Sequence, residues 1–207
     1  GSPGIGKGSV MSTLSSYDSK LRKKPESDKF SYRHPSDSDH FDNFRTWMHT
    51  MIFEDVAQLS PGKQMGVDPS VQFFMKAINN QPWCPPMAHL EDKGKTPVMV
   101  DTVFVTSNTL DLNIPVYFQH SYAPMRRFPL HIEPVVKTDY RKQGSMDIDY
   151  TKAISTPGEY DDFWEYTIRV PTSKGVNPFH SGEFVEDPSL KCSNVKELLA
   201  LYKKMCL

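Results

Sequence analysis

A length of 207 residues with 38% hydrophobic and 12% aromatic side chains is enough for one solid domain with room for a small appendage. The formal net charge of −1 excludes a global basic field, so any attraction to nucleic acid must be local. The three cysteines, Cys84, Cys192 and Cys206, lie far apart, which argues against a disulfide framework or a zinc site and favours a reducing compartment. No stretch approaches about 20 consecutive apolar residues, so no membrane-spanning helix is predicted.

The chain opens with GSPGIGKGSV, a glycine-rich run that contains Gly-Lys. Such a run cradles the phosphates of a nucleotide, because its backbone N–H groups point inward and its Lys reaches the terminal phosphates. Gly8 stands where a Ser or Thr normally offers a hydroxyl to Mg²⁺, and Ser9 follows it. A flexible N-terminal end would have a similar composition, so both interpretations stay open at this point. The candidate nucleotide-binding residues are Gly1, Ser2, Pro3, Gly4, Ile5, Gly6, Lys7, Gly8 and Ser9.

Helix and strand patterns alternate after this run. A helix is predicted over residues 8–21 and another over residues 68–79, where Asp68 is placed as the N-cap. The short runs 48–56 and 98–106 are rich in β-branched and aromatic residues, which predicts two buried strands. This alternation predicts an α/β fold with a largely parallel sheet flanked by helices.

Polar side chains stand at the ends of both predicted strands. Glu54 and Asp55 end the first strand, where an acidic pair can hold Mg²⁺ and activate water in a nucleotide hydrolase. Asn108 follows the second strand and is placed to reach between a phosphate and that water. Each of these residues is also common in solvent-exposed turns, so the pattern alone does not decide between a catalytic residue and a turn residue.

The C-terminal third has a looser pattern. Residues 140–191 are predicted as loops around one strand at 163–170, and an amphipathic helix follows. Asn194 and Glu197 are spaced as a capping box for that helix. Its apolar face consists of Val195, Leu198, Leu199, Tyr202 and Met205.

Several stretches occur together and in order: the glycine run, YRHPSDSDHFDNF, FEDVAQ, PPMAHLEDKG, VFVTSN and RRFPLHIE. With this set the chain resembles the superfamily three helicase-type NTPases of picorna-like positive-strand RNA viruses, which are relatives of the AAA+ proteins. The resemblance covers about residues 1–135. It implies a P-loop NTPase core over 1–135 that lacks its first strand, and a C-terminal extension over 136–207.

The resemblance also implies roles for single residues, with ATP and Mg²⁺ as ligands. Glu54, where the family usually has Asp, and Ser9 would help to hold the metal, Asp55 would hold it and polarise water, and Asn108 would sense the γ-phosphate. Arg126 and Arg127 match a pair that acts as arginine fingers in the neighbouring subunit's site, which implies a ring, most simply a hexamer. Such twin arginines are otherwise ordinary surface residues.

Further implications concern partners. His89, Lys93 and Lys95 lie in a stretch that matches the pore-facing loop of the family, where they would contact RNA phosphates; a plain surface loop is the alternative. The terminal helix corresponds to one that plugs into the adjacent protomer, or it packs on its own domain. The family implies membrane association through an N-terminal segment outside this sequence, other viral replication proteins as partners, and membrane-associated replication complexes in the host cytoplasm.

Two functions follow from these expectations. The first is an ATP-hydrolysing, ring-forming RNA helicase or RNA-remodelling NTPase. The second is a nucleotide-dependent RNA chaperone or assembly scaffold with weak or no hydrolysis, which Gly8 would favour. A small-molecule kinase fits less well, because no acceptor pocket can be recognised in the sequence.

Overall fold

The computed structural model describes residues 2–36, 38–59, 61, 66–174 and 181–206. The chain forms two compact units, which are called here by their sheets. The parallel-sheet unit consists of residues 18–113, and the antiparallel-sheet unit consists of residues 2–17 together with 114–206.

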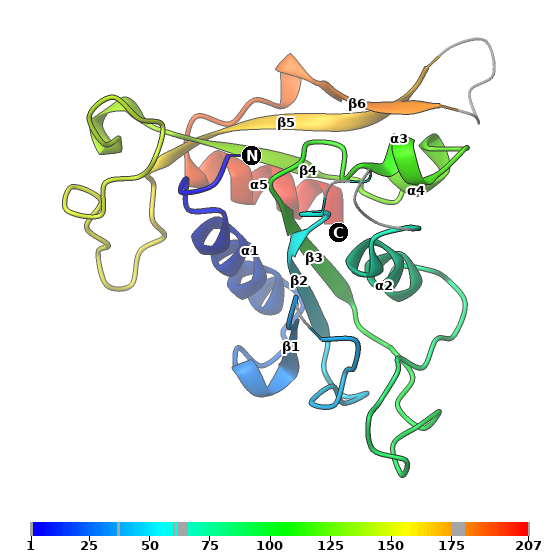
Figure 1. Cartoon of the computed structure of the whole chain (residues 1–207). Coiled ribbons are helices and arrows are strands. Elements are labelled where there is room, and N and C mark those ends of the chain that lie inside the picture. The colour runs from blue at the N-terminus through cyan, green and yellow to red at the C-terminus, as the bar shows by residue number, and fades with distance from the viewer. Residues whose placement is uncertain (1, 37, 60, 62–65, 175–180, 207) are drawn as a thin grey trace. The chain divides into compact units, whose positions relative to one another are not determined.

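The parallel-sheet unit is built on three parallel strands in the order β1-β2-β3 (Figure 1). These strands are β1 (Ser31–His34), β2 (Thr50–Val56) and β3 (Thr102–Ser107). The central strand β2 is buried along most of its length, with Met51, Ile52 and Phe53 at most 1% exposed. This confirms the prediction of a parallel sheet and of its two main strands, while β1 is an additional strand in that sheet.

Helix α2 (Pro69–Ala77) packs against this sheet and confirms the helix predicted over 68–79. The Asp68 side chain accepts a hydrogen bond from the Ser70 backbone N–H, so Asp68 caps the helix, and Pro69 occupies the first turn. A 3₁₀ turn, η1 (Asp28–Phe30), leads into β1. The core beside the sheet is aromatic: Phe41 is fully buried and stacks on His34 at a ring distance of 4.1 Å.

The antiparallel-sheet unit contains strands in the order β4-β5-β6, and Figure 1 shows β5 as the long strand of this sheet. Their bounds are β4 (His131–Val136), β5 (Trp164–Ser173) and β6 (Gly182–Glu186). Strand β5 confirms the strand predicted over 163–170, but it begins one residue later and continues to Ser173. The antiparallel pairing was not predicted, because β6 is too short for its alternation to be recognised.

The helices of this unit are short except at its two ends. Helix α1 (Lys7–Leu21) begins here, and α3 (Ile114–Tyr117), α4 (Tyr122–Met125) and the 3₁₀ turns η3 (Thr138–Tyr140) and η4 (Pro188–Leu190) follow. The last helix is α5 (Val195–Cys206). None of the helices within the described ranges combines the length and the apolar character needed to cross a membrane.

Helix α5 begins with reciprocal side-chain bonds. The Asn194 side chain accepts from the Glu197 N–H at 2.9 Å, and the Glu197 carboxylate accepts from the Ser193 N–H at 2.7 Å. The helix buries its apolar face, since Leu198 is 1% exposed and Tyr202 is 4% exposed. Tyr202 also meets Tyr17 of the same unit edge to face. The domain boundary expected after residue 135 falls inside β4, which is paired with β5 along its length.

Candidate functional site

The glycine run forms a loop that leads directly into helix α1. Gly4 and Gly6 have φ angles of 78° and 83°, a left-handed conformation that residues with a side chain rarely adopt. The N–H groups of Ser9 and Val10 donate to the Gly6 carbonyl, and α1 begins at Lys7. The loop therefore places a helix N-terminus and its N–H groups behind two glycines, which is the geometry that binds phosphate. Gly1 lies outside the described residues.

Two hydrogen bonds hold this loop to other residues of the antiparallel-sheet unit. The Ile148 N–H donates to the Gly4 carbonyl at 3.2 Å, and the buried Trp164 indole Nε1 donates to the Ile5 carbonyl at 2.6 Å. The ring of Trp164 also lies so close to Gly6 that an added Cβ would stand 2.6 Å from it. These bonds show that the described part of the run is held in place, and its role in binding phosphate stays a prediction.

The loop carries a positive charge at Lys7 and has open space beside Gly8, two features that a phosphate-binding loop needs. The Lys7 ammonium donates to the Ser2 carbonyl at 2.8 Å, so this cation stays at the loop, and the first turn of α1 has no acidic residue. Gly8 is exposed, and a Cβ added to it would meet nothing within 4 Å. The missing hydroxyl at position 8 is thus a chemical difference and is not imposed by crowding.

In the parallel-sheet unit, the candidate acids lie on a bulge at the end of β2. The register passes from Phe53 opposite Val105 to Val56 opposite Ser107, so Glu54 and Asp55 together face a single residue of β3. Bulges of this kind redirect side chains and are frequent beside active sites. Asp55 has a left-handed φ of 54° and is exposed.

The Glu54 carboxylate has a defined partner. Its Oε1 accepts a hydrogen bond from Arg33 Nη1 of β1 at 2.9 Å, and both side chains are nearly half exposed. Carboxylates at a strand end together with nucleotide phosphates are the ligands that Mg²⁺ prefers, so Glu54 and Asp55 fit that ion chemically. Among the described residues, no group of three or more His, Cys, Asp and Glu side chains gathers that could hold a metal by itself.

Side chains of β3 and its surroundings hold the backbone of this bulge. The Asp55 N–H donates to Thr106 Oγ1 at 3.1 Å, and the Ser107 hydroxyl donates to the Val56 carbonyl at 2.6 Å. The next residue, Ala57, is buried with φ 60°. Its N–H donates to Ser70 Oγ, and its carbonyl accepts from the Asn113 side chain.

Sequence reasoning missed these supporting residues. The stretch VFVTSN was recognised, but only its Asn was given a role, since a Thr or Ser within a strand is usually an ordinary strand residue. Asn108 directly follows β3 and is exposed. Because β2 and β3 are parallel, Glu54, Asp55 and Asn108 all lie at the carboxyl end of the sheet.

The candidate finger pair follows α4 in the antiparallel-sheet unit. Arg126 caps α4, and the N–H groups of Arg126 and Arg127 donate to the carbonyls of Tyr122 and Pro124. Both side chains are exposed, and within the described residues neither guanidinium has a hydrogen bond or an ion pair. Exposed guanidinium groups of this kind are compatible with ordinary surface residues and with arginine fingers that act on another copy of the chain.

The candidate RNA loop lies in the parallel-sheet unit as a series of turns. His89, Lys93 and Lys95 are all exposed, and Leu90 beside them is 83% exposed. The loop is anchored where the Ala88 N–H donates to the Asp42 carboxylate at 2.6 Å. Its cations therefore project from a fixed base.

Comparison with known proteins places the chain in a family. A family model described as RNA helicase matches residues 1–109. The genome polyprotein of Bovine enterovirus (strain VG-5-27) is 30% identical over 156 residues, which are 75% of this chain and 6% of that polyprotein. The genome polyproteins of Poliovirus type 3 (strain 23127) and Poliovirus type 1 (strain Mahoney) are each 29% identical over 149 residues, 72% of this chain and 6% of theirs. The chain thus spans about 6% of the length of these curated relatives.

Proposed function

Because the chain belongs to the RNA helicase family, as a superfamily three helicase of the picorna-like viral type, we propose that it is an ATP-hydrolysing ring enzyme that unwinds or remodels viral RNA. The observation that carries this proposal is the glycine loop, which two left-handed glycines turn into the start of α1. The N–H groups at the start of α1 that precede Ser9 are the ones proposed to donate to phosphate oxygens. The AAA+ type of core is part of the proposal.

In the proposed nucleotide site, different groups bind the phosphates, hold the metal ion and orient the attacking water. The N–H groups of the loop and the Lys7 ammonium bind the phosphates of ATP. Glu54, Asp55 and Ser9 are the residues proposed to hold Mg²⁺, which when bound neutralises charge on the phosphates. The Asp55 carboxylate accepts a hydrogen bond from the attacking water and orients it. The Asn108 amide binds between the terminal phosphate and that water.

The twin arginines make this activity depend on assembly. In the proposal, Arg126 and Arg127 of one copy stabilise charge at the phosphates bound to the next copy, an effect worth about 10³–10⁵ in rate where such fingers operate. Their exposed, unbonded guanidinium groups in the described chain support this role. A closed ring, most simply a hexamer, gives every site one such neighbour.

RNA and the other viral replication proteins are the proposed partners. His89, Lys93 and Lys95 contact RNA phosphates without regard to base sequence, because they offer only positive charge and hydrogen-bond donors. The proposed setting is the membrane-associated replication complex in the host cytoplasm, with membrane attachment by a segment outside this sequence.

Gly8 supports a second candidate function. Without a hydroxyl at this position, phosphates can still bind to the backbone and to Lys7 while Mg²⁺ is held poorly. The chain would then be a nucleotide-dependent RNA chaperone or assembly scaffold with weak hydrolysis.

One experiment separates these functions: Mg²⁺-dependent ATP hydrolysis measured against protein concentration. The native chain is compared with Gly8→Ser, Arg127→Ala and the control Lys191→Ala, which changes an exposed lysine of the same unit. Specific activity that rises with concentration and falls only in Arg127→Ala supports the ring enzyme. Activity that appears only in Gly8→Ser supports the scaffold. Nucleotide binding by none of the four proteins would contradict both.

A further inference from the structure

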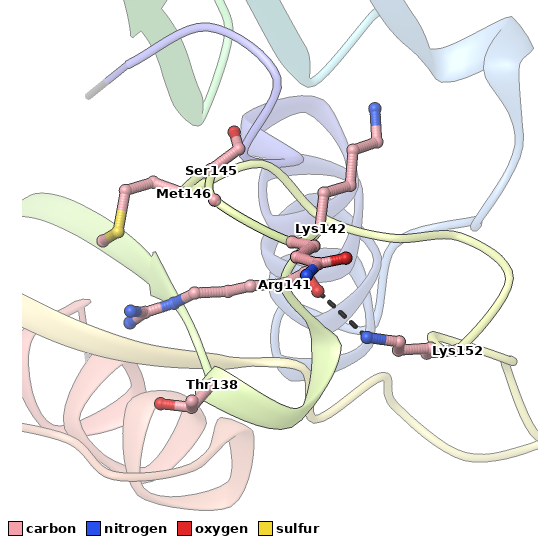
Figure 2. A pocket seen from close by; sticks show the side chains of 8 residues that line it. Thr138, Arg141, Lys142, Ser145, Met146 and Lys152 are labelled. Carbon is pink, nitrogen blue, oxygen red and sulfur yellow. Dashed lines mark hydrogen bonds between the residues drawn. The ribbon is translucent and has the colours of Figure 1, made fainter.

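A pocket of about 580 Å³ lies on the segment that follows β4 in the antiparallel-sheet unit (Figure 2). Three cations line it, namely Arg141, Lys142 and Lys152, and Thr138 and Ser145 add hydroxyl groups. No carboxylate is among its lining residues. Its lining residues include none of the phosphate loop and neither arginine of the candidate finger pair, while Ile148 of the same segment donates to the Gly4 carbonyl of that loop at 3.2 Å.

The three cations differ in how firmly they are held. Arg141 Nε donates to the Val136 carbonyl at 2.6 Å, which fixes that side chain near β4. The Lys152 ammonium donates to the Arg141 carbonyl at 3.2 Å and lies 3.8 Å from an oxygen of Asp149. Lys142 is exposed, and within the described residues its side chain makes no hydrogen bond or ion pair. Lys142 is therefore the most available of the three for an anionic ligand.

The nearby carboxylates have partners outside the pocket, and of the two only Asp149 also lies near a pocket cation, with its second oxygen 3.8 Å from the Lys152 ammonium. One oxygen of Asp149 accepts from the N–H of Thr151 at 3.0 Å and from its hydroxyl at 2.6 Å. The Asp147 carboxylate faces Gly4, with an oxygen 2.6 Å from where a Cβ of that glycine would stand. Neither carboxylate belongs to the lining, so the pocket itself offers cations and neutral polar groups.

The shape of the cation set indicates what kind of anion fits. Figure 2 shows the side chains of Arg141, Lys142 and Lys152 leaving the loop in different directions, so they do not converge on one point. A single small phosphate needs converging donors, whereas a chain of successive phosphates meets cations that are spread apart. The arrangement favours an extended polyanion over a free phosphate ion.

Exposed apolar side chains stand on the same segment. Met146 lines the pocket and is 50% exposed, Tyr150 is 64% exposed, and Ile154 is 76% exposed. Sites for single-stranded nucleic acid combine positive charge along the backbone with aromatic faces on which bases stack. We propose that the segment 138–154 is a second RNA-binding site, which takes the backbone of a single strand in the pocket and stacks a base on Tyr150.

The test measures binding of a fluorescein-labelled single-stranded oligouridylate by anisotropy, without nucleotide and over a range of salt concentrations. The full chain carries Lys93→Ala and Lys95→Ala, so that the candidate RNA loop does not mask the pocket. Lys142→Glu is compared with Lys191→Glu, the same charge change at an exposed lysine of the same unit that does not line the pocket. Tyr150→Ala tests the stacking step.

We expect Lys142→Glu to weaken binding about tenfold at low salt and to lower the slope of log K against log salt by about 0.7, the value for one phosphate contact on a single strand. Tyr150→Ala should weaken binding at least about fivefold without changing that slope, because stacking involves no counterion release. Lys191→Glu should have little effect on either.

Equal losses in Lys142→Glu and Lys191→Glu would overturn the proposal, because they would show a general charge effect. Unchanged RNA affinity in Lys142→Glu would also overturn it, and loss of pyrophosphate binding in that variant, measured by calorimetry, would assign the pocket to a small anion. Binding is measured without nucleotide, so failure here leaves the proposed ATP hydrolysis unaffected. A failure of hydrolysis likewise leaves this site standing.

Discussion

Arg33 and Glu54, on neighbouring parallel strands, form an ion pair in which Arg33 Nη1 lies 2.9 Å from Glu54 Oε1. The proposed metal ligand is therefore hydrogen-bonded to a guanidinium. The family usually has the shorter Asp at this position, and the longer Glu side chain allows this carboxylate to reach Arg33. The pair links the chemistry of the site to a residue of β1 that has no role in the expected motif.

Arg33→Ala should lower the Mg²⁺ concentration needed for half-maximal ATP hydrolysis, because the guanidinium competes with the ion for Glu54. The pair is nearly half exposed and is worth up to about 1 kcal/mol, so the shift should be no more than about fivefold. A magnesium titration of activity measures it, with Arg33→Lys as the variant that keeps the charge. A higher Mg²⁺ requirement in Arg33→Ala would show instead that Arg33 orients the carboxylate for the metal.

Gly4→Ala should weaken nucleotide binding strongly, while Gly8→Ala should leave it nearly unchanged. Gly4 has a φ of 78°, and a Cβ there would stand 2.6 Å from an Asp147 carboxylate oxygen. Gly8 has open space around its added Cβ and lies within α1. Titration with a fluorescent ATP analogue measures both affinities.

The double variant Gly4→Ala with Asp147→Ala separates the two effects at Gly4. Removing the carboxylate relieves the contact, but the left-handed backbone remains unfavourable for Ala, so recovery should be partial. Full recovery would mean that crowding alone decides the affinity. Equal affinities in Gly4→Ala and Gly8→Ala would contradict the geometry described for the phosphate loop.

Ala57→Gly should stabilise the protein by roughly 1 kcal/mol, because Ala57 has a left-handed φ of 60° that glycine adopts without strain. The gain will be reduced by the greater freedom of glycine in the unfolded chain and by the loss of the buried Ala57 methyl group. Urea unfolding measures the change. The matched control is Ala200→Gly at an exposed position of α5, which should cost about 1 kcal/mol. Destabilisation in both variants would show that the bulge does not store strain at Ala57.

The sequence predicted those parts of the fold that depend on local patterns. Asp68 before Pro69 specified the start of α2, and the apolar run of β2 specified a buried parallel strand. The antiparallel sheet depends on pairing between distant residues, such as His131 with Arg169, and no local pattern encodes that pairing.

The candidate site divides in the same way. The glycines and the acids of the proposed site could be recognised because their spacing carries the chemistry. The hydrogen bonds by which Thr106 and Ser107 support the bulge could not be recognised from the sequence. They form between residues distant in the chain, and Thr and Ser are common in any strand. Likewise, the availability of Lys142 follows from its surroundings and not from its neighbours in sequence.

His131 should make the protein less stable as the pH falls. Its Nδ1 is buried without a hydrogen-bond partner in the described structure, and burial, together with the positive charge of Arg169, lowers the pKa of His131 to about 4. In the unfolded chain its pKa is about 6.5, so between these values the unfolded state binds a proton that the native state does not. Stability is therefore lost from about pH 6.5 down to about pH 4, by up to about 3 kcal/mol.

His131→Phe should reduce this loss, because phenylalanine binds no proton in either state and can keep the ring contact with Phe184, now 4.7 Å between centroids. Some pH dependence should remain, since burial also lowers the pKa of His34. Urea unfolding at pH 7 and pH 5 measures the difference, with His89→Gln as the exposed control. If His131→Phe lost as much stability as the native chain between these two pH values, the buried imidazole would not be the group that responds to pH.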